Sequence, residues 1–181
     1  MREVNPDQQN TSIDVKKIIE TLVAFVKNPI EQISHIPDWN WPSLFLVQIV
    51  ISITSGLLAG LIKFNIYRMA AGLFLMPFVS TITSLLLTTF LYYYFQFFEN
   101  RTENFRKIFT FVILTSIPFY IFQIISEYFA PITLIGFGFS FLLSIVGLSE
   151  NFKVTKKRAY ELVGVLFVLV LITWLTNRFS I

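Results

Sequence analysis

The sequence has no cysteine and a single histidine, and only 14% of its residues are charged. Without cysteine the chain forms no disulfide, and thiol catalysis and thiolate metal sites are excluded. His35 has no second ligand candidate, so we interpret it as a polar surface residue. No HExxH pair, Ser–His arrangement or carboxylate cluster is visible either. These absences predict a protein that is not an enzyme and that uses no cofactor or metal.

A strong charge of one sign is also missing. The net charge of +3 is too small and too dispersed for a nucleic-acid-binding protein, so no nucleic-acid partner is expected. No Asp, Glu, Lys, Arg or His lies deep in any long apolar run. Ion-coupled transporters and proton pumps usually need such buried ionisable groups, so their absence counts against that class.

Long apolar runs dominate the chain instead. Its residues are 55% hydrophobic and 17% aromatic, and its mean hydropathy is +0.68, which is too apolar for one soluble core of 181 residues. A run of about 18–20 apolar residues spans a bilayer. Such runs lie at about 44–62, 70–98, 107–126, 131–148 and 159–177. The predicted fold class is an all-α, polytopic membrane protein with five transmembrane helices, in a domain at 43–181.

Residues 1–42 form an N-terminal segment that lacks the pattern of a cleavable signal peptide. Within it, 11–27 predicts an amphipathic helix whose apolar face has helical spacing: Val15, Ile18, Ile19, Leu22, Val23 and Val26. We expect this helix to lie on the bilayer surface or to dock a partner protein; the alternative is that it packs against the protein's own loops. Asn28 and Pro29 predict the start of a short second helix ending before Pro37. Trp39 and Trp41 are expected at the membrane–water boundary.

The basic residues alternate between the two predicted sides of the membrane. Of the 14 Lys and Arg residues, only Lys63, Arg68 and Arg178 fall on the side of the C-terminus. The other side has Arg2, Lys16, Lys17, Lys27, Arg101, Arg106, Lys107, Lys153, Lys156, Lys157 and Arg158. By the positive-inside rule, the N-terminus is predicted to be cytoplasmic and the C-terminus outside.

Small residues and prolines mark sites of helix packing and bending. Gly56 and Gly60 in the first span, and Gly147 in the fourth, predict close approach between helices, and the Gly56/Gly60 face also predicts self-association. Pro77 and Pro118 are predicted to kink the second and third spans. The second span also has six serines and threonines, which predict close helix packing or, alternatively, a polar-lined cavity: Ser80, Thr81, Thr83, Ser84, Thr88 and Thr89.

Three stretches in the right order resemble the Yip1-domain family of membrane proteins. Residues 24–30 (AFVKNPI), followed by the tryptophans at 39–41, resemble the helix-then-proline segment ahead of that family's first span. Residues 104–111 (NFRKIFTF), leading to Pro118, resemble its loop before the third span. Residues 147–159 (GLSENFKVTKKRA) resemble its Gly-Leu-Ser-Glu turn and basic segment. Order and spacing carry this resemblance.

The resemblance implies a five-span protein with a cytoplasmic N-terminus. Eukaryotic members are Golgi and endoplasmic-reticulum proteins that associate with Rab GTPases and have an Asp-Leu-Tyr-Gly-Pro-like segment ahead of the first span. This chain has residues 39–42 (WNWP) there instead, a departure that suits a bacterial member. The expected location is therefore a bacterial inner membrane, with a Golgi or endoplasmic-reticulum membrane as the alternative.

Two functions remain open from the sequence. The first is a non-enzymatic scaffold or adaptor that organises the membrane or partner proteins through its N-terminal helix and loops. The second is a small transporter, channel or lipid-moving protein with a polar path between its second, third and fourth spans. For the scaffold, the predicted surface for anionic lipid headgroups or a partner consists of Arg101, Arg106, Lys107, Glu150, Lys153, Lys156, Lys157 and Arg158. Ordinary positive-inside residues with no partner are the alternative interpretation.

Overall fold

The computed structural model describes residues 13–126, 128–129 and 131–179, which form seven α-helices and no strand. Two short helices come first, α1 (Val15–Lys27) and α2 (Pro29–Ile33). Five long helices follow: α3 (Trp41–Ile62), α4 (Ile66–Phe98), α5 (Phe105–Ser126), α6 (Ile132–Phe152) and α7 (Lys156–Phe179). Each long helix has the length and apolarity of a membrane span. The predicted all-α, five-span fold class is therefore confirmed.

Several spans extend beyond the apolar runs seen in the sequence, because polar caps continue the helices. The side chain of Asn40 accepts a hydrogen bond from the Ser43 amide at the start of α3, at 3.0 Å. The side chain of Asn65 does the same for the Arg68 amide, at 3.1 Å, and α4 thus begins four residues before the expected position 70. At its other end, α6 continues past residue 148 to Phe152.

The N-terminal helices match their predicted positions within the described residues. The carboxylate of Asp14 accepts a hydrogen bond from the Lys17 amide and caps α1, while residues 11–12 of the predicted helix lie outside the described residues. Pro29 occupies the first turn of α2, which ends at Ile33. The Asn28 side chain bonds the Glu31 carboxylate rather than a backbone amide. Both helices pack into the main core, since Phe25 and Ile33 are fully buried.

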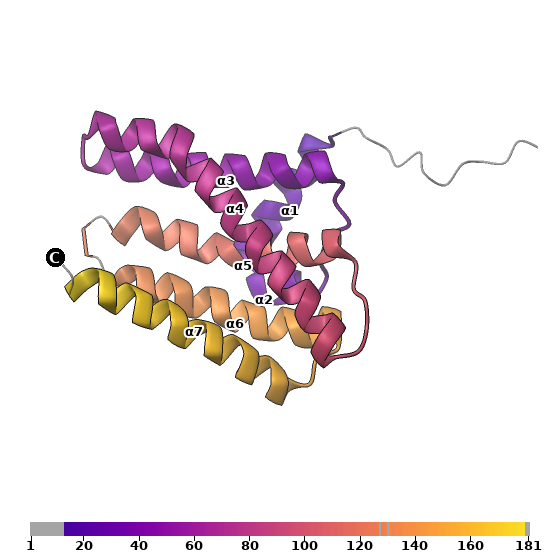
Figure 1. The fold of residues 1–181 in the computed structure, drawn as a ribbon. Helices are drawn as coiled ribbons and strands as arrows, with labels where there is room; N and C mark the ends of the chain where they lie inside the picture. The colour runs from indigo at the N-terminus through magenta and orange to yellow at the C-terminus, as the bar shows by residue number, and fades with distance from the viewer. Residues whose placement is uncertain (1–12, 127, 130, 180–181) are drawn as a thin grey trace, which may run out of the picture.

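The five spans are arranged around α5, as Figure 1 shows. α3 and α4 form an antiparallel pair on one side of α5, and α6 with α7 forms a second pair on the other side. α1 and α2 cross one end of this bundle, in contact with α3, α5 and α6. α5 is the most enclosed span, because helices from both pairs cover it.

The two prolines lie inside continuous helices. Pro77 is within α4, and Figure 1 shows α4 following α3 over its first part and then turning across α5. A proline removes one helical amide donor and crowds the preceding turn, so a bend near Pro77 is expected. Pro118 lies within α5, one turn after hydroxyls that bond backwards along the helix.

Glycines mark the closest contacts between helices. A Cβ on Gly56 would lie 2.6 Å from the Cα of Gly72 in α4, and one on Gly60 would lie 2.7 Å from the Met69 nitrogen. A Cβ on Gly147 would meet the Phe111 ring at 2.5 Å. These three glycines therefore permit contacts within one chain. α4 of the same chain covers the Gly56/Gly60 face, so this face is used inside the chain, and self-association itself stays a prediction.

The largest buried side chains gather where α1 and α2 meet the bundle. Fully buried aromatic residues there come from α1, α4, α5 and α6: Phe25, Phe95, Phe109, Phe111 and Phe152. Residues 99–104, between α4 and α5, and residues 153–155, between α6 and α7, lie at the same end. We call this part of the molecule, made of α1, α2 and these two connections, the basic end.

Candidate functional site at the basic end

The turn after α6 gives the basic end its shape. Lys153 adopts a left-handed conformation, with φ 50° and ψ 29°, and ends the helix. The next amide, that of Val154, donates to the Leu148 carbonyl at 3.1 Å, and the Val154 side chain is buried. The chain thereby reverses direction within three residues and starts α7 at Lys156. This geometry leaves the last carbonyls of α6 without helical partners.

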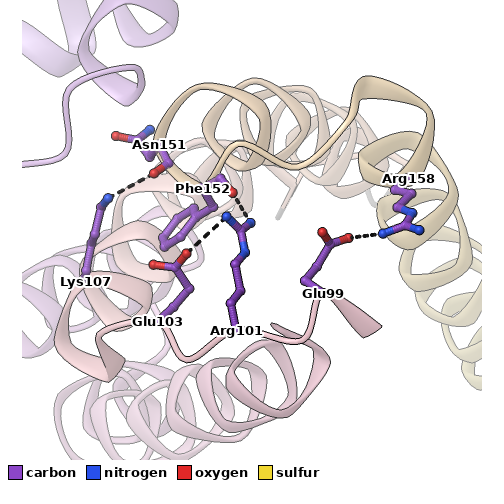
Figure 2. Close-up of polar contacts among 7 residues, drawn as sticks. All are labelled: Glu99, Arg101, Glu103, Lys107, Asn151, Phe152 and Arg158. Carbon is purple, nitrogen blue, oxygen red and sulfur yellow. Dashed lines mark hydrogen bonds and ion pairs between the residues drawn. The ribbon is translucent and has the colours of Figure 1, made fainter. Parts of the chain in front are cut away.

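Two basic side chains bond those carbonyls, one from the α4–α5 connection and one from the first turn of α5, as Figure 2 shows. Lys107 Nζ donates to the Asn151 carbonyl at 3.0 Å, and an Arg101 guanidinium nitrogen donates to the Phe152 carbonyl. Positive groups at a helix C-terminus also interact favourably with the helix dipole. Arg101 and Lys107 therefore act as capping groups that join the α4–α5 connection and the start of α5 to the end of α6.

An aromatic stack lies beneath the two cations. Phe152 stacks on Phe95 with ring centroids 5.1 Å apart and meets Phe111 edge-on at 5.5 Å. Lys107 Nζ lies 4.9 Å from the centre of the Phe152 ring, and the Arg101 guanidinium lies 5.2 Å from that of Phe95. Each such cation–π contact stabilises by roughly 0.5–2 kcal/mol. The stack therefore holds the same two cations that cap α6.

Asn151 connects the end of α6 to the N-terminal helices. Its side-chain amide donates to the Ile33 carbonyl at 2.6 Å, and its side-chain oxygen accepts from the Ile36 amide at 3.3 Å. One side chain thus bonds the backbone at the end of α2 and beyond it. Gly147, one turn earlier in α6, makes room for Ile33.

Carboxylates pair with the other arginines. Arg106 lies 2.7 Å from Asp38, and Arg158 lies 2.9 Å from Glu99, which connects the start of α7 to the end of α4 (Figure 2). Arg101 also lies 3.5 Å from Glu103. Every arginine of the predicted surface therefore has a partner within the chain.

The structure divides the predicted surface into two groups. Arg101, Arg106 and Lys107 are half-buried in intramolecular contacts. The exposed members are Glu150, Lys153, Lys156, Lys157 and Arg158. The sequence did not identify the partners that bind these basic residues within the chain, which are Asp38, Glu99, Asn151 and Phe152. The only signal for Asn151 and Phe152 was their place inside the 147–159 stretch.

The two tryptophans ahead of α3 have different surroundings. Trp39 was expected at a membrane–water boundary, but only 4% of its surface is exposed, so protein encloses its ring. Trp41 is partly exposed and packs against Phe45, Phe105 and Phe109. Only Trp41 is thus available for contact with lipid headgroups.

The apolar residues of α1 are partly buried and partly exposed. Ile18 and Phe25 are buried, and α1 contacts α2 and the span α3, whereas the alternative interpretation expected it to pack against the protein's own loops. Four other residues of the apolar face remain exposed: Val15, Ile19, Val23 and Val26. α1 therefore packs on the protein with one edge and presents a second apolar edge outward.

Inside the spans, most of the hydrogen bonds of the polar side chains go to backbone carbonyls. Gln48 donates to the Tyr120 hydroxyl at 3.1 Å, and Ser55 donates to the Tyr120 carbonyl at 2.9 Å. On α4, Thr83, Thr88 and Thr89 bond carbonyls one turn earlier in their own helix, and Ser80 bonds the Pro77 carbonyl. Among the described residues, no three His, Cys, Asp or Glu side chains gather as a metal site.

The comparison with protein families agrees with this architecture. The model of the Yip1 domain matches residues 24–176, from the second half of α1 to the last turns of α7. The chain belongs to the Yip1-domain family. Searches of curated proteins and of solved structures find no match. The Yip1 domain here thus includes the end of α1, all of α2 and the five spans of an integral, multi-pass membrane protein.

Proposed function

We propose that this Yip1-domain protein is a non-enzymatic scaffold, which holds partner membrane proteins or anionic lipid headgroups against its basic end. The observation that carries the proposal is the division of the basic residues there. The half-buried group holds the end of α6 and the aromatic stack together, and Asn151 joins α2 to them in one frame. Beside that frame, Lys153, Lys156 and Lys157 remain exposed.

The exposed lysines stand at an electrostatically favourable place for an anion. Lys156 and Lys157 open α7, and its first turn has no acidic residue. A helix N-terminus has a partial positive charge, so it disfavours lysines and favours a bound anion. Lys157 lies 4.0 Å from Glu161, but exposed pairs of this kind contribute little. An acidic protein segment or a lipid phosphate would relieve this concentration of positive charge.

We also propose that the basic end faces the cytoplasm, in the inner membrane of a bacterium. Seven basic residues lie in or directly beside the two connections of this end, Arg101, Arg106, Lys107, Lys153, Lys156, Lys157 and Arg158, whereas Lys63 and Arg68 lie in or near the connection between α3 and α4 at the other end. This asymmetry follows the positive-inside rule.

The rival function, a polar path through the spans, has less support. The hydroxyls of Ser80, Thr83, Thr88 and Thr89 bond backbone within α4, which leaves them little capacity for a passing solute. A transport path also needs groups that exchange partners. Close helix packing accounts for these hydroxyls more simply.

Crosslinking in native membranes tests the scaffold. A photoreactive residue at Lys156 should give a discrete protein adduct, which weakens when Lys153 and Lys157 become glutamates. The same photoreactive residue at Leu169, exposed on α7 within the span, is the matched control and should react with lipid alone. Equal protein adducts at both positions would refute the proposal, and so would the absence at Lys156 of any protein or phospholipid adduct that depends on Lys153 and Lys157. Solute flux in liposomes that contain only this protein would favour the rival.

A further inference from the structure

A groove lies between α1, α3 and α5, with a volume of about 220 Å³. Leu22 and Val26 of α1 form one wall, Val50 and Thr54 of α3 a second, and Ile121 and Ile124 of α5 a third. We propose that this groove is a binding site for one acyl chain of a membrane lipid. The inference does not depend on the scaffold function, because none of these residues belongs to the exposed lysine group.

The depth of the groove favours an acyl chain. Val50 and Thr54 follow the first residue of α3, Trp41, by nine and thirteen positions. At 1.5 Å per residue they lie roughly 14–20 Å along the helix. The hydrocarbon layer is about 30 Å thick, so this depth is inside it. The acyl chains of lipids fill this layer of the bilayer.

The chemistry of the walls also favours an acyl chain. Eight of the ten lining residues are apolar or aromatic, and the hydroxyl of Ser55 is already bonded to the Tyr120 carbonyl. Water needs two to four polar partners in such a space, and these walls do not offer them. A polar solute would lose its hydration without replacement.

α1 distinguishes this groove from the rest of the lipid-facing surface. Ile18 and Phe25 fix α1 against the bundle, which places Leu22 and Val26 over the groove. A chain in the groove therefore contacts protein on three sides, whereas a lipid beside Leu169 on the outer face of α7 meets one helix. The greater contact area predicts longer occupancy at the groove.

Photocrosslinking from the lipid tests the site. The full chain is reconstituted into phosphatidylglycerol vesicles with a trace of phospholipid that has a diazirine in mid-chain, and adducts are mapped by peptide mass spectrometry. Adducts at Val50 and Ile121 should exceed those at Leu142 and Leu169, which are equally or more exposed. A diazirine-labelled free fatty acid in a parallel sample shows whether a chain without a phosphate headgroup also enters.

A bulky side chain that fills the groove should abolish the excess of adducts there. Val50→Trp should lower the adducts at Ile121 about tenfold, a difference of about 1.4 kcal/mol in binding, and leave those at Leu169 unchanged. Leu58→Trp, on the same helix and outside the groove, is the matched control. If Val50→Trp does not fold, Ile121→Trp with readout at Val50 replaces it. Equal adducts at Ile121 and Leu169, or a preference that survives the filled groove, would overturn the inference.

Discussion

Lys107 illustrates how a single side chain acts in this protein. A lysine in a loop beside a membrane is expected to point into water or towards a lipid phosphate. Lys107 instead donates to the Asn151 carbonyl and lies over the Phe152 ring. It therefore belongs to the fold of the basic end, and a negatively charged partner would have to compete with both contacts.

Removing the ammonium of Lys107 should destabilise the protein. Lys107→Met keeps the apolar stem but loses a charged hydrogen bond and a cation–π contact, and we expect a loss of about 1–3 kcal/mol. The thermal unfolding midpoint in detergent measures this change. Lys156→Met is the control, since Lys156 is exposed, and should leave the midpoint unchanged. Equal effects of the two variants would argue against a capping role for Lys107.

Sequence reasoning could identify the basic residues but could not divide them. Arg101 and Lys107 were grouped with Lys156 and Lys157 because all four flank apolar runs. Their difference depends on carbonyls of α6, more than forty residues away in the chain. No local pattern reports such a contact.

At the scale of elements, the contact between α3 and α4 depends on two glycines that face each other. Gly56 is half of a visible small-xxx-small pair, whereas its partner Gly72 stands without a second glycine in its own helix. The sequence therefore predicted that the Gly56 face packs closely but not which helix it packs against. Helix spans were easier to predict, because apolar length alone defines them.

Alanine substitutions at two glycines should have opposite effects. Gly56→Ala places a Cβ 2.6 Å from the Gly72 Cα, so α3 and α4 must separate, and we expect a loss of about 1–3 kcal/mol. Gly138→Ala, on α6, meets no atom within 4 Å and should stabilise by about 0.4–1 kcal/mol through helix propensity. Unfolding midpoints of both variants in one detergent check the contrast. A neutral Gly56→Ala would show that this contact tolerates a methyl group.

The outward edge of α1 should lie in lipid. An environment-sensitive fluorophore on Val23→Cys, in a chain that has no other cysteine, should show the emission of an apolar environment in lipid nanodiscs. The same fluorophore on Lys17→Cys, on the polar side of the helix, should show an aqueous environment. Aqueous emission from both positions would place α1 off the membrane surface.

At the scale of the whole molecule, each of the five spans joins the two ends of the bundle, so successive connections alternate between those ends. The basic end holds α1, α2 and two connections, while the opposite end holds the connection between α3 and α4 and that between α5 and α6. The proposed scaffold requires every exposed lysine of the basic end to face one compartment. The apolar runs of the sequence predicted the five spans that place these segments at one end, while the prediction from the charge counts that this end is cytoplasmic stays a prediction. Which compartment they face is set by the membrane and needs a direct measurement.

Labelling of single cysteines in oriented vesicles makes that measurement. The natural chain has no cysteine, so Glu150→Cys at the basic end and Tyr67→Cys at the opposite end each give one exposed thiol. A membrane-impermeant maleimide should label Glu150→Cys only in inside-out vesicles of the bacterial membrane and Tyr67→Cys only in right-side-out vesicles. Labelling of both positions from the same side, or in the reverse order, would contradict the account.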